Sequence, residues 1–392
     1  MMSDKLIEIK NLKTYFYTEA GTAKAVNDVS FDIMKGEVLG IVGESGSGKS
    51  VTSLSINRLI PNPPGEIVSG KILYNKNFDI NDKRMIGQKI PFDIEYEKEL
   101  ETDSGAIEKE KVVIKEGTII NPGILKELIA LDDIQELKIP VNLLDLSFDG
   151  IREFRGRDIA MIFQEPMTSL NPVLTIGYQM NEVLIKHEQL TKEEATEKSI
   201  QMLELVGIPD PENRMNEYPH QFSGGMRQRV MIAMALQCNP ALLIADEPTT
   251  ALDVTIQAQI LDLMLDLKNK QTDSAILLIT HDLAVVAETC DRVIVMYGGE
   301  IQEIATVSEL FKNPLHPYTQ ALMDSIPQME STTNRLKALK GMVPSIIDMD
   351  DGCKFCNRFD GKDCPCYGTK ENQKLIEASP GHFVRCHEKI IK

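Results

Sequence analysis

The sequence has no excess of positive charge. Its 42 lysines and arginines are outnumbered by 59 aspartates and glutamates, so the formal net charge is −17 at pH 7. Nucleic acids and anionic membrane surfaces are themselves negative, and this balance argues against broad, unspecific attraction to either; only a local basic patch would escape the argument. We therefore expect no nucleic-acid partner.

Long apolar runs are also missing. No stretch approaches the roughly 18 consecutive apolar residues that cross a bilayer, and the residues from Met1 to Lys5 do not introduce the apolar core of a signal peptide. The length of 392 residues and the otherwise ordinary composition predict a folded chain of two or three domains. We expect it in the cytoplasm unless a partner holds it at a membrane.

The most informative stretch follows an apolar run at residues 38–42. It reads G-E-S-G-S-G-K-S and fits the P-loop pattern G-x-x-x-x-G-K-[ST], between a strand pattern and a helix pattern. The glycines let backbone N–H groups close around phosphates, and the helix presents its positive end to the same charge. Lys49 is predicted to reach the β- and γ-phosphates, and the Ser50 hydroxyl to ligate Mg²⁺. The predicted nucleotide-binding residues of this stretch are Gly43, Glu44, Ser45, Gly46, Ser47, Gly48, Lys49, Ser50 and Val51.

Strand and helix patterns alternate along most of the chain, which predicts an α/β protein with a mainly parallel sheet. Strand patterns lie at residues 6–16, 25–33, 38–42, 70–74, 159–163, 242–248 and 275–280, and helical patterns lie at 51–59, 173–215, 230–237 and 256–268. Residues 76–142 interrupt this order with an acidic segment that contains a strand-like part at 111–115 and a helix-like part at 124–131. We expect a small folded insert there, without a catalytic motif.

Further polar residues stand at the ends of these patterns. Gln164 follows the strand at 159–163, Asp246 and Glu247 lie at the end of the strand at 242–248, and His281 follows the last strand. A serine and two glycines at 223–225 precede the helix at 230–237. Together with the P-loop, these motifs resemble the nucleotide-binding subunit of an ATP-binding-cassette (ABC) transporter, and they occur in that family's order.

The resemblance implies a fold and a set of site residues. It places a P-loop NTPase cassette at residues 1–310, made of a mainly parallel sheet, an antiparallel β subdomain and a helical subdomain at 165–222, and it places a cysteine-rich extension at 311–392. It identifies 43–50 as the Walker A loop and 246–247 as the end of Walker B. The other implied site residues are Phe16 against the adenine, Gln164 in the Q-loop, Ser223, Gly224, Gly225 and Gln228 in the signature, Asp253 in the D-loop and His281 as the H-switch.

The implied chemistry is hydrolysis of ATP. Phosphoryl transfer to water needs the spreading negative charge neutralised and a water held in line. We expect Asp246 to hold Mg²⁺ through its water shell, with Gln164 touching both the metal and the attacking water. Glu247 is the predicted general base, and His281 is predicted to bridge Glu247 and the γ-phosphate. Lys49 completes the predicted catalytic set.

The signature predicts that two chains are needed. Ser223 and the N–H groups of Gly224 and Gly225 lie at the start of a helix and form a second anion site. In the family this site caps the γ-phosphate bound to the opposite subunit, so two cassettes sandwich two nucleotides. We expect a second ABC ATPase subunit as a partner, either an identical chain or a paralogue.

The C-terminal region narrows the family. The sequence N-P-L-H-P-Y-T-Q-A-L at 313–322, with the segments at 325–327, 341–345 and 352–353, looks like the tail of the oligopeptide, dipeptide and nickel importer ATPases. This implies a subunit on the cytoplasmic face of the membrane that powers import of peptides, bound to two permease subunits and served indirectly by an extracytoplasmic substrate-binding protein. Nickel on the same machinery is an alternative.

A soluble ABC ATPase that acts on DNA or the ribosome is a second alternative. Such proteins usually carry a long coiled-coil insert or a second cassette. This chain has one cassette, and its insert lacks sustained heptads of apolar residues.

Five of the seven cysteines crowd the C-terminal extension, namely Cys353, Cys356, Cys364, Cys366 and Cys386. In a cytoplasmic protein such clustering favours a metal site over disulfides. Relatives in this branch carry a four-cysteine tail similar to a [4Fe–4S] site, but this chain has Arg358 and Phe359 where they have an Arg-Cys pair. We expect an iron–sulfur cluster, with Zn²⁺ and unligated thiols as alternatives.

Overall fold

The computed structural model describes twelve parts of the chain, and of residues 97–101, 107–110 and 254 it describes the backbone alone. The described parts are residues 5–101, 107–131, 134–165, 169–249, 254–270, 272–325, 341, 343–347, 349, 352–355, 358 and 374–385.

The centre of the fold is an eight-stranded sheet with the order β13-β14-β12-β11-β3-β10-β9-β8. Five neighbouring strands in it run parallel, and the three at the other edge run antiparallel. The parallel strands are β3 (Val38–Val42), β8 (Ile159–Ile162), β9 (Leu242–Asp246), β10 (Ala275–Ile279) and β11 (Arg292–Tyr297), and the others are β12 (Glu300–Thr306), β13 (Ile376–Ser379) and β14 (His382–Val384). Every residue of β3, β9 and β10 is buried, as expected for strands covered on both faces. The predicted mainly parallel core is confirmed.

A second sheet is antiparallel, with the order β2-β1-β4-β7. Its strands are β1 (Lys5–Thr18), β2 (Gly21–Met34), β4 (Gly65–Asp79) and β7 (Glu136–Asn142). Three of them contain the strands predicted at 6–16, 25–33 and 70–74. One apolar core joins buried residues of this sheet to those of β3, β9 and β10.

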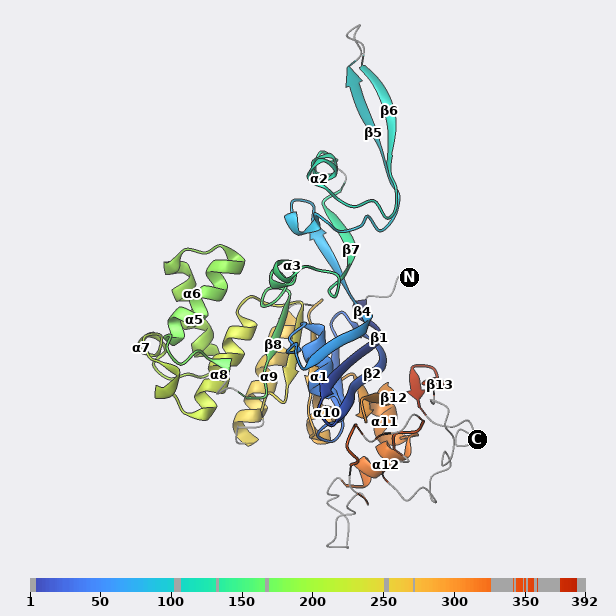
Figure 1. Cartoon of the computed structure of the whole chain (residues 1–392). Helices are drawn as coiled ribbons and strands as arrows, with labels where there is room; N and C mark the ends of the chain where they lie inside the picture. The colour runs from blue at the N-terminus through green and yellow to red at the C-terminus, as the bar shows by residue number, and fades with distance from the viewer. Residues whose placement is uncertain are drawn as a thin grey trace.

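The segment between β4 and β7 folds into a projection. It contains η1 (Lys83–Met85), α2 (Pro122–Ile129) and a hairpin of β5 (Ile94–Glu101) and β6 (Ile107–Ile114). Figure 1 shows the hairpin extending away from the rest of the molecule. The predicted strand at 111–115 overlaps β6, and the predicted helix at 124–131 overlaps α2. The extent and role of the insert at 76–142 stay predictions.

A buried charge network fixes the base of this projection. The carboxylate of Asp158, which is 5% exposed, forms ion pairs with Lys76 and Arg84, and it accepts a hydrogen bond of 3.3 Å from the hydroxyl of Tyr74. Burial lowers the pKa of Lys76, and the facing Asp158 opposes that shift. Because Asp158 directly precedes β8 while its partners lie on or after β4, this network ties the two sheets together.

Four helices form a separate cluster beside the sheet, and all of them except the shortest, which has four residues, share a second apolar core with β8 and β9. They are α5 (Ile176–Glu188), α6 (Lys192–Leu205), α7 (Pro211–Arg214) and α8 (Gly224–Leu236), with the short helix η2 (Pro219–Gln221) before α8. The predicted start of the last helix at residue 230 is wrong. It begins at Gly224, because the Ser223 hydroxyl accepts a hydrogen bond of 3.3 Å from the N–H of Met226 and so caps the helix.

The remaining helices connect the strands. They are α1 (Lys49–Ile56), α3 (Phe148–Arg152), α9 (Val254–Lys270), α10 (Leu283–Thr289), α11 (Val307–Lys312) and α12 (Pro317–Asp324). Among the helices of the described residues, none combines the length and the apolar character that a membrane crossing requires.

The described end of the chain returns to the central sheet. Strand β14 pairs with β12, opposing Val384 to Glu303 and Phe383 to Ile304. The side chain of Glu303 is fully buried, and His382 Nε2 lies 2.7 Å from its carboxylate. The sequence patterns did not predict β13 or β14, which add two strands to the edge of the sheet.

Candidate functional site

The register of the parallel strands brings the predicted site residues together. Ile279 of β10 lies opposite Ile41 of β3 on one side and opposite Asp246 of β9 on the other. The residues that follow these three positions therefore leave the sheet at one edge. They are the P-loop after β3, Glu247 after β9 and His281 after β10.

The P-loop depends on glycine at two positions. Gly43 has φ of 152° and Gly48 has φ of 101°, a region that other residues rarely adopt. A Cβ atom on Gly43 would lie 2.2 Å from the Met296 carbonyl oxygen, and one on Gly48 would lie 2.4 Å from the Ala25 carbonyl oxygen. The loop is thus held against β11 and β2 by close backbone contact that no side chain allows.

Lys49 bends back over this loop. Its Nζ donates to the carbonyl oxygens of Gly43 at 2.7 Å and Glu44 at 3.0 Å, and the residue is 5% exposed. Burial lowers the pKa of the Lys49 ammonium, while the nearby carboxylates of Glu247 and Asp246 oppose the shift. A buried cation held only by neutral carbonyls is suited to an anionic ligand.

The loop also offers hydrogen-bond donors to such a ligand. The first N–H groups of a helix have no acceptor within it, and here they belong to Lys49, Ser50 and Val51 at the start of α1. Ser47 is buried, and its hydroxyl has no hydrogen-bond partner among the described residues. Ser45 and Gly46 are exposed at the crest of the loop. The cation, the N–H groups and the free hydroxyl together fit the phosphates of a nucleotide.

Two oxygen ligands for a hard cation stand beside the P-loop. The Ser50 hydroxyl donates to Asp246 Oδ1 at 3.0 Å. Burial raises the pKa of Asp246, and the neighbouring Glu247 adds to that shift, while Ser50 and Lys49 oppose it. A serine hydroxyl and a carboxylate are ligands that Mg²⁺ accepts beside nucleotide phosphates, so this pair fits the predicted magnesium site.

Glu247 lies at the centre of the polar cluster. Its Oε2 accepts a hydrogen bond of 3.0 Å from Gln164 Nε2 and lies 3.5 Å from His281 Nδ1. Its backbone has φ of 47°, in the left-handed region, and its N–H donates to the Ile279 carbonyl at 2.9 Å. This unusual backbone turns the carboxylate out of the sheet towards the two side chains that follow β8 and β10.

The signature residues lie apart from this cluster, at the exposed start of α8. Ser223 and Gly224 are exposed, and Gly225 is half-buried. In Figure 1, α8 stands with α5 to α7 at one side of the cassette and α1 stands near its middle. Within one chain the signature therefore faces solvent.

Gln228 behaves differently from the rest of the signature. It is fully buried, and its side-chain amide donates to the carbonyl of Pro248, which follows Walker B. This position favours a structural role inside the chain, where it joins α8 to the end of β9, over the predicted contact with nucleotide. Asp253 lies outside the described residues.

Phe16 is half-buried on β1, opposite Ala23 of β2 and Gly65 of β4. The same part of β2 supplies the Ala25 carbonyl that lies against Gly48 of the P-loop. Phe16 is therefore carried by strands that border the nucleotide loop, and its contact with adenine stays a prediction.

Of the five tail cysteines, only Cys353 lies in the described part of the chain. It is half-buried and packs at the border of the apolar cluster that contains Tyr318 and Phe355. Cys356, Cys364, Cys366 and Cys386 lie outside the described residues. Within the residues that are described, no group of three or more possible ligands for a metal ion comes together.

Comparison with known proteins agrees with this geometry. A family model described as "ABC transporter" matches residues 26–119 and 124–250, and one described as "Oligopeptide/dipeptide transporter, C-terminal region" matches residues 302–366. This chain belongs to the ABC transporter family. It is therefore an ATPase of that family, and ATP is its substrate.

Curated relatives match this ABC protein over nearly its whole length. The chain is 44% identical to the probable peptide ABC transporter ATP-binding protein y4tR of Sinorhizobium fredii, with 98% of this chain and 95% of that one covered. It is 44% identical to the oligopeptide transport ATP-binding protein AppD of Bacillus subtilis, with 97% and 96% covered, and 41% identical to DppD, the dipeptide transport ATP-binding protein of that organism, with 98% and 94% covered.

Solved structures show the same fold. The cassette MJ0796, in a dimeric post-hydrolysis state bound to ADP and Pi, superposes with a TM-score of 0.54 at 23% identity, covering 77% of this chain and 98% of that one. A second dimeric structure of this bacterial ABC transporter cassette gives a TM-score of 0.54 at 24% identity. The ABC cassette fold predicted from the sequence is confirmed.

The sequence motifs missed two residues that touch the nucleotide loop of this ABC cassette. The Tyr318 hydroxyl accepts a hydrogen bond of 2.9 Å from the N–H of Glu44, and Arg358 forms an ion pair with the Glu44 carboxylate. Both come from the part of the chain that follows the central strands. The aromatic residue within the run H-P-Y at 316–318 was a local signal, but it does not say what Tyr318 contacts.

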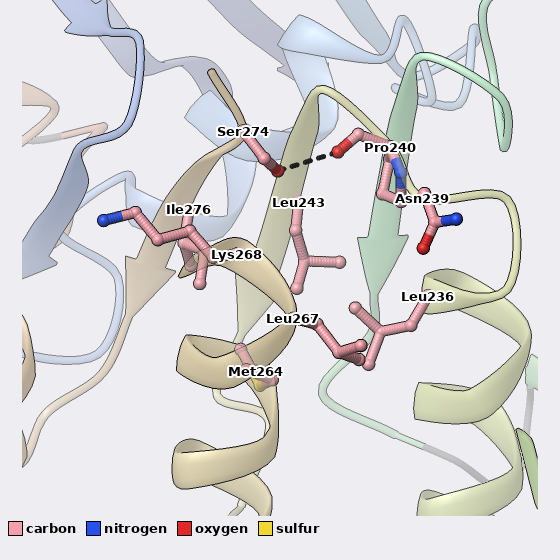
Figure 2. A pocket seen from close by; sticks show the side chains of 9 residues that line it. All are labelled: Leu236, Asn239, Pro240, Leu243, Met264, Leu267, Lys268, Ser274 and Ile276. Carbon is pink, nitrogen blue, oxygen red and sulfur yellow. Dashed lines mark hydrogen bonds between the residues drawn. The ribbon is translucent and has the colours of Figure 1, made fainter. Parts of the chain in front are cut away.

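A small pocket at the opposite edge of the sheet is not a second ligand site. It is lined by residues of α8, α9, β9 and β10, including Leu243 and Ile276 near the starts of their strands, and it has a volume of about 20 Å³ (Figure 2). That volume suffices for about one water molecule. The Ser274 hydroxyl already donates to the Pro240 carbonyl at its rim, at 2.9 Å.

The first prediction concerns the general base. Glu247→Gln keeps the shape of the side chain and its contact with Gln164, but it removes the charge that takes a proton from water. We expect ATP to bind with wild-type affinity in a direct titration, and ATP turnover to fall about 10²- to 10⁴-fold.

Lys49→Ala is the contrasting variant for this experiment. It removes the buried cation of the P-loop, so ATP affinity itself should fall. Turnover near the wild-type rate in Glu247→Gln would exclude Glu247 as the base, and unchanged ATP affinity in Lys49→Ala would contradict the placement of the phosphates.

Proposed function

We propose that this chain is the ATP-hydrolysing subunit of a membrane importer for peptides. One observation carries the proposal: the P-loop, the Ser50–Asp246 pair and the Gln164–Glu247 contact lie at one edge of the sheet in a chain whose residues 302–366 match the C-terminal region of oligopeptide and dipeptide transporters. The relatives compared are peptide, oligopeptide and dipeptide transport proteins. Their names favour peptide over nickel as cargo, and favour import over a soluble role on nucleic acid.

Different residues of the site have different roles in ATP hydrolysis. The P-loop N–H groups and Lys49 bind the phosphates and orient the γ-phosphoryl group. Glu247 accepts a proton from the attacking water, and its carboxylate is oriented by Gln164 on one side and His281 on the other. His281 is 68% exposed at its side chain, so it can turn towards the γ-phosphate when nucleotide binds.

Ser50 and Asp246 are the residues that would hold Mg²⁺. When bound, the ion supplies positive charge to the β- and γ-phosphate oxygens, where negative charge develops during transfer. In this structure Ser50 and Asp246 are joined by a hydrogen bond, so the Ser50 hydroxyl already points at the carboxylate with which it would share the ion.

The exposed signature supports a partner cassette. Ser223 caps α8, a helix of thirteen residues, and the N–H groups of Gly224 and Gly225 at its exposed start are suited to an anion that another chain carries. In the proposed dimer this site closes over the γ-phosphate bound to the P-loop of the other cassette. ATP then joins the two cassettes, and its hydrolysis releases them.

The second prediction tests this dimer. Ser223→Arg places a long side chain in the shared interface, so we expect hydrolysis to be lost while nucleotide affinity of the single chain stays near the wild-type value. The measurement is ATP turnover beside a direct nucleotide titration. A monomer that is fully active at high dilution would refute the dimer.

Import requires membrane partners. We propose that the cassette binds two permease subunits at the cytoplasmic face of the membrane, through the helical part of the cassette beyond Gln164, and that an extracytoplasmic binding protein delivers the peptide. The partner cassette is either a second copy of this chain or a paralogue.

The third prediction concerns the cargo. The complex of this chain with its permease subunits, its partner cassette and the binding protein, reconstituted in lipid vesicles, should hydrolyse ATP faster when a peptide is present. A dipeptide, a longer oligopeptide and Ni²⁺ are compared in parallel. Stimulation by Ni²⁺ alone would move the assignment to nickel import, and no stimulation by any of them would contradict the proposed function.

The C-terminal extension is proposed to hold a [4Fe–4S] cluster on four of the five cysteines 353, 356, 364, 366 and 386, with Zn²⁺ as the alternative. Their thiolates are soft ligands that suit either metal. A metal would supply folding free energy to a segment with little apolar surface. Its role would be structural, because the ATPase residues are complete without it.

The fourth prediction tests this extension. Protein purified without oxygen should be brown and contain close to four irons per chain, as four thiolates around a [4Fe–4S] cluster require. The measurement is metal analysis with an absorption spectrum, and Cys353→Ser should bleach the colour. Stoichiometric zinc without iron would assign a zinc site, and protein without metal would contradict both.

A further inference from the structure

We propose that Tyr318 and Arg358 are positioning residues for the nucleotide site, which act through Glu44 and make ATP binding depend on the C-terminal region. The inference rests on the proposed ATP-hydrolysing function, and it adds a control element to the same site. It is carried by contacts between the P-loop and two residues that lie 274 and 314 positions later in the chain.

Glu44 is held at all three of its polar groups. Its N–H donates to the Tyr318 hydroxyl at 2.9 Å, its carboxylate pairs with Arg358, and its carbonyl accepts from Lys49 Nζ at 3.0 Å. The first two contacts come from the C-terminal region, and the third comes from the phosphate-binding lysine. The conformation of this one residue therefore links the C-terminal region to Lys49.

Tyr318 is rigidly placed. It is fully buried, and its ring centroid lies 4.7 Å from that of Tyr297 and 5.4 Å from that of Phe355. Burial raises the pKa of the Tyr318 hydroxyl, so the group stays neutral and the N–H of Glu44 has a fixed acceptor at physiological pH.

A second line of contacts holds the start of α12, which carries Tyr318. The N–H of Tyr318 donates to His316 Nδ1 at 3.1 Å, and burial lowers the pKa of His316 to about 3, so this nitrogen remains an acceptor. The N–H of His316 donates to the carboxylate of Glu303 at 2.9 Å. Because His382 of β14 also binds Glu303, the contacts run without a break from the last described strand to the P-loop.

Arg358 supplies the charge in this arrangement. Its side chain is 5% exposed and that of Glu44 is 30% exposed, so the pair lies where water screens it weakly. Phe355, three residues before Arg358, packs edge-on against Tyr297 with ring centroids 5.6 Å apart. The segment that carries Arg358 is thus seated on the same aromatic cluster that places Tyr318.

These contacts bear on ATP because of what Lys49 must do. The lysine now donates to the carbonyls of Gly43 and Glu44, and it must turn towards phosphate oxygens when nucleotide binds. If Glu44 is released, the start of the loop can relax, and binding then includes the cost of restoring the receptive shape. By holding Glu44 in place, the C-terminal region keeps the P-loop in the conformation that binds ATP.

The fifth prediction is made with Tyr318→Phe in the full chain. The change removes one hydroxyl and leaves the ring in its cluster. We expect the dissociation constant for ATP to rise roughly 5- to 150-fold, the range for losing one partner of a buried hydrogen bond. The measurements are a nucleotide titration and thermal unfolding of the same preparations.

Tyr74→Phe is the matched control. Tyr74 is 2% exposed, and its hydroxyl also makes one hydrogen bond, which it donates to Asp158 at the base of the projection. Both variants should lower the melting temperature by similar amounts, but only Tyr318→Phe should weaken ATP binding. Two results would overturn the inference. If both variants weaken ATP binding equally, the cause is a general loosening of the fold. If neither variant weakens it, Tyr318 has no link to the P-loop.

A set of charge variants tests the second contact independently, and it remains informative if Tyr318→Phe folds poorly. Glu44→Gln and Arg358→Gln should each weaken ATP binding. The double variant should bind ATP with the same affinity as either single variant. If the losses of ATP-binding free energy in the two single variants simply add in the double variant, the role of the ion pair is overturned. Wild-type protein that binds no ATP would overturn the proposed function itself, and this inference with it.

Discussion

The parallel pairing of β3, β10 and β9 fixes where chemistry can occur in this protein. Hydrogen bonds between these strands set Ile41, Ile279 and Asp246 side by side, so the chain leaves the sheet three times at one place. The strands are buried along their whole length on both faces, so slipping one of them by a single residue would exchange the side chains that pack against the two faces of the sheet. The positions of the phosphate loop, the metal-binding carboxylate and the base all follow from that register.

The same register explains why much of the site could be predicted from the sequence. A glycine loop between a strand and a helix, and two carboxylates at the end of an apolar strand, are local patterns. Their neighbours in space follow once the strands are taken as parallel. The closeness of Glu247 and His281 was therefore expected from the order of the motifs, and the structure places His281 Nδ1 3.5 Å from the Glu247 carboxylate. Gln164 was expected to touch the metal and the attacking water, and its direct hydrogen bond of 3.0 Å to Glu247 was not predicted.

Other features leave no such local pattern. Ser223 caps α8 because a serine hydroxyl replaces the missing helical partner of Met226; the resemblance placed a helix start here, but the apolar pattern, which the two glycines do not share, began only at residue 230. Gln228 was grouped with the signature by its place in the sequence, but its side chain turns inward to Pro248. Two other contacts join distant parts of the chain, namely the pairing of β14 with β12 and the contact of Tyr318 with Glu44. The sequence pattern of a segment does not indicate which distant segment it contacts.

Glu44 and Tyr318 are far apart in the sequence, so the ribosome makes them at different times. A ribosome adds roughly 5–20 residues per second, so Tyr318 is made roughly 15–50 s after Glu44, and the strands at 376–384 follow later still. Each of the three strands that lead into the ATP site is complete before that time. A nascent chain can thus form its catalytic edge while the start of the P-loop still lacks both of its C-terminal contacts, and the loop reaches its final shape only as the last part of the chain arrives.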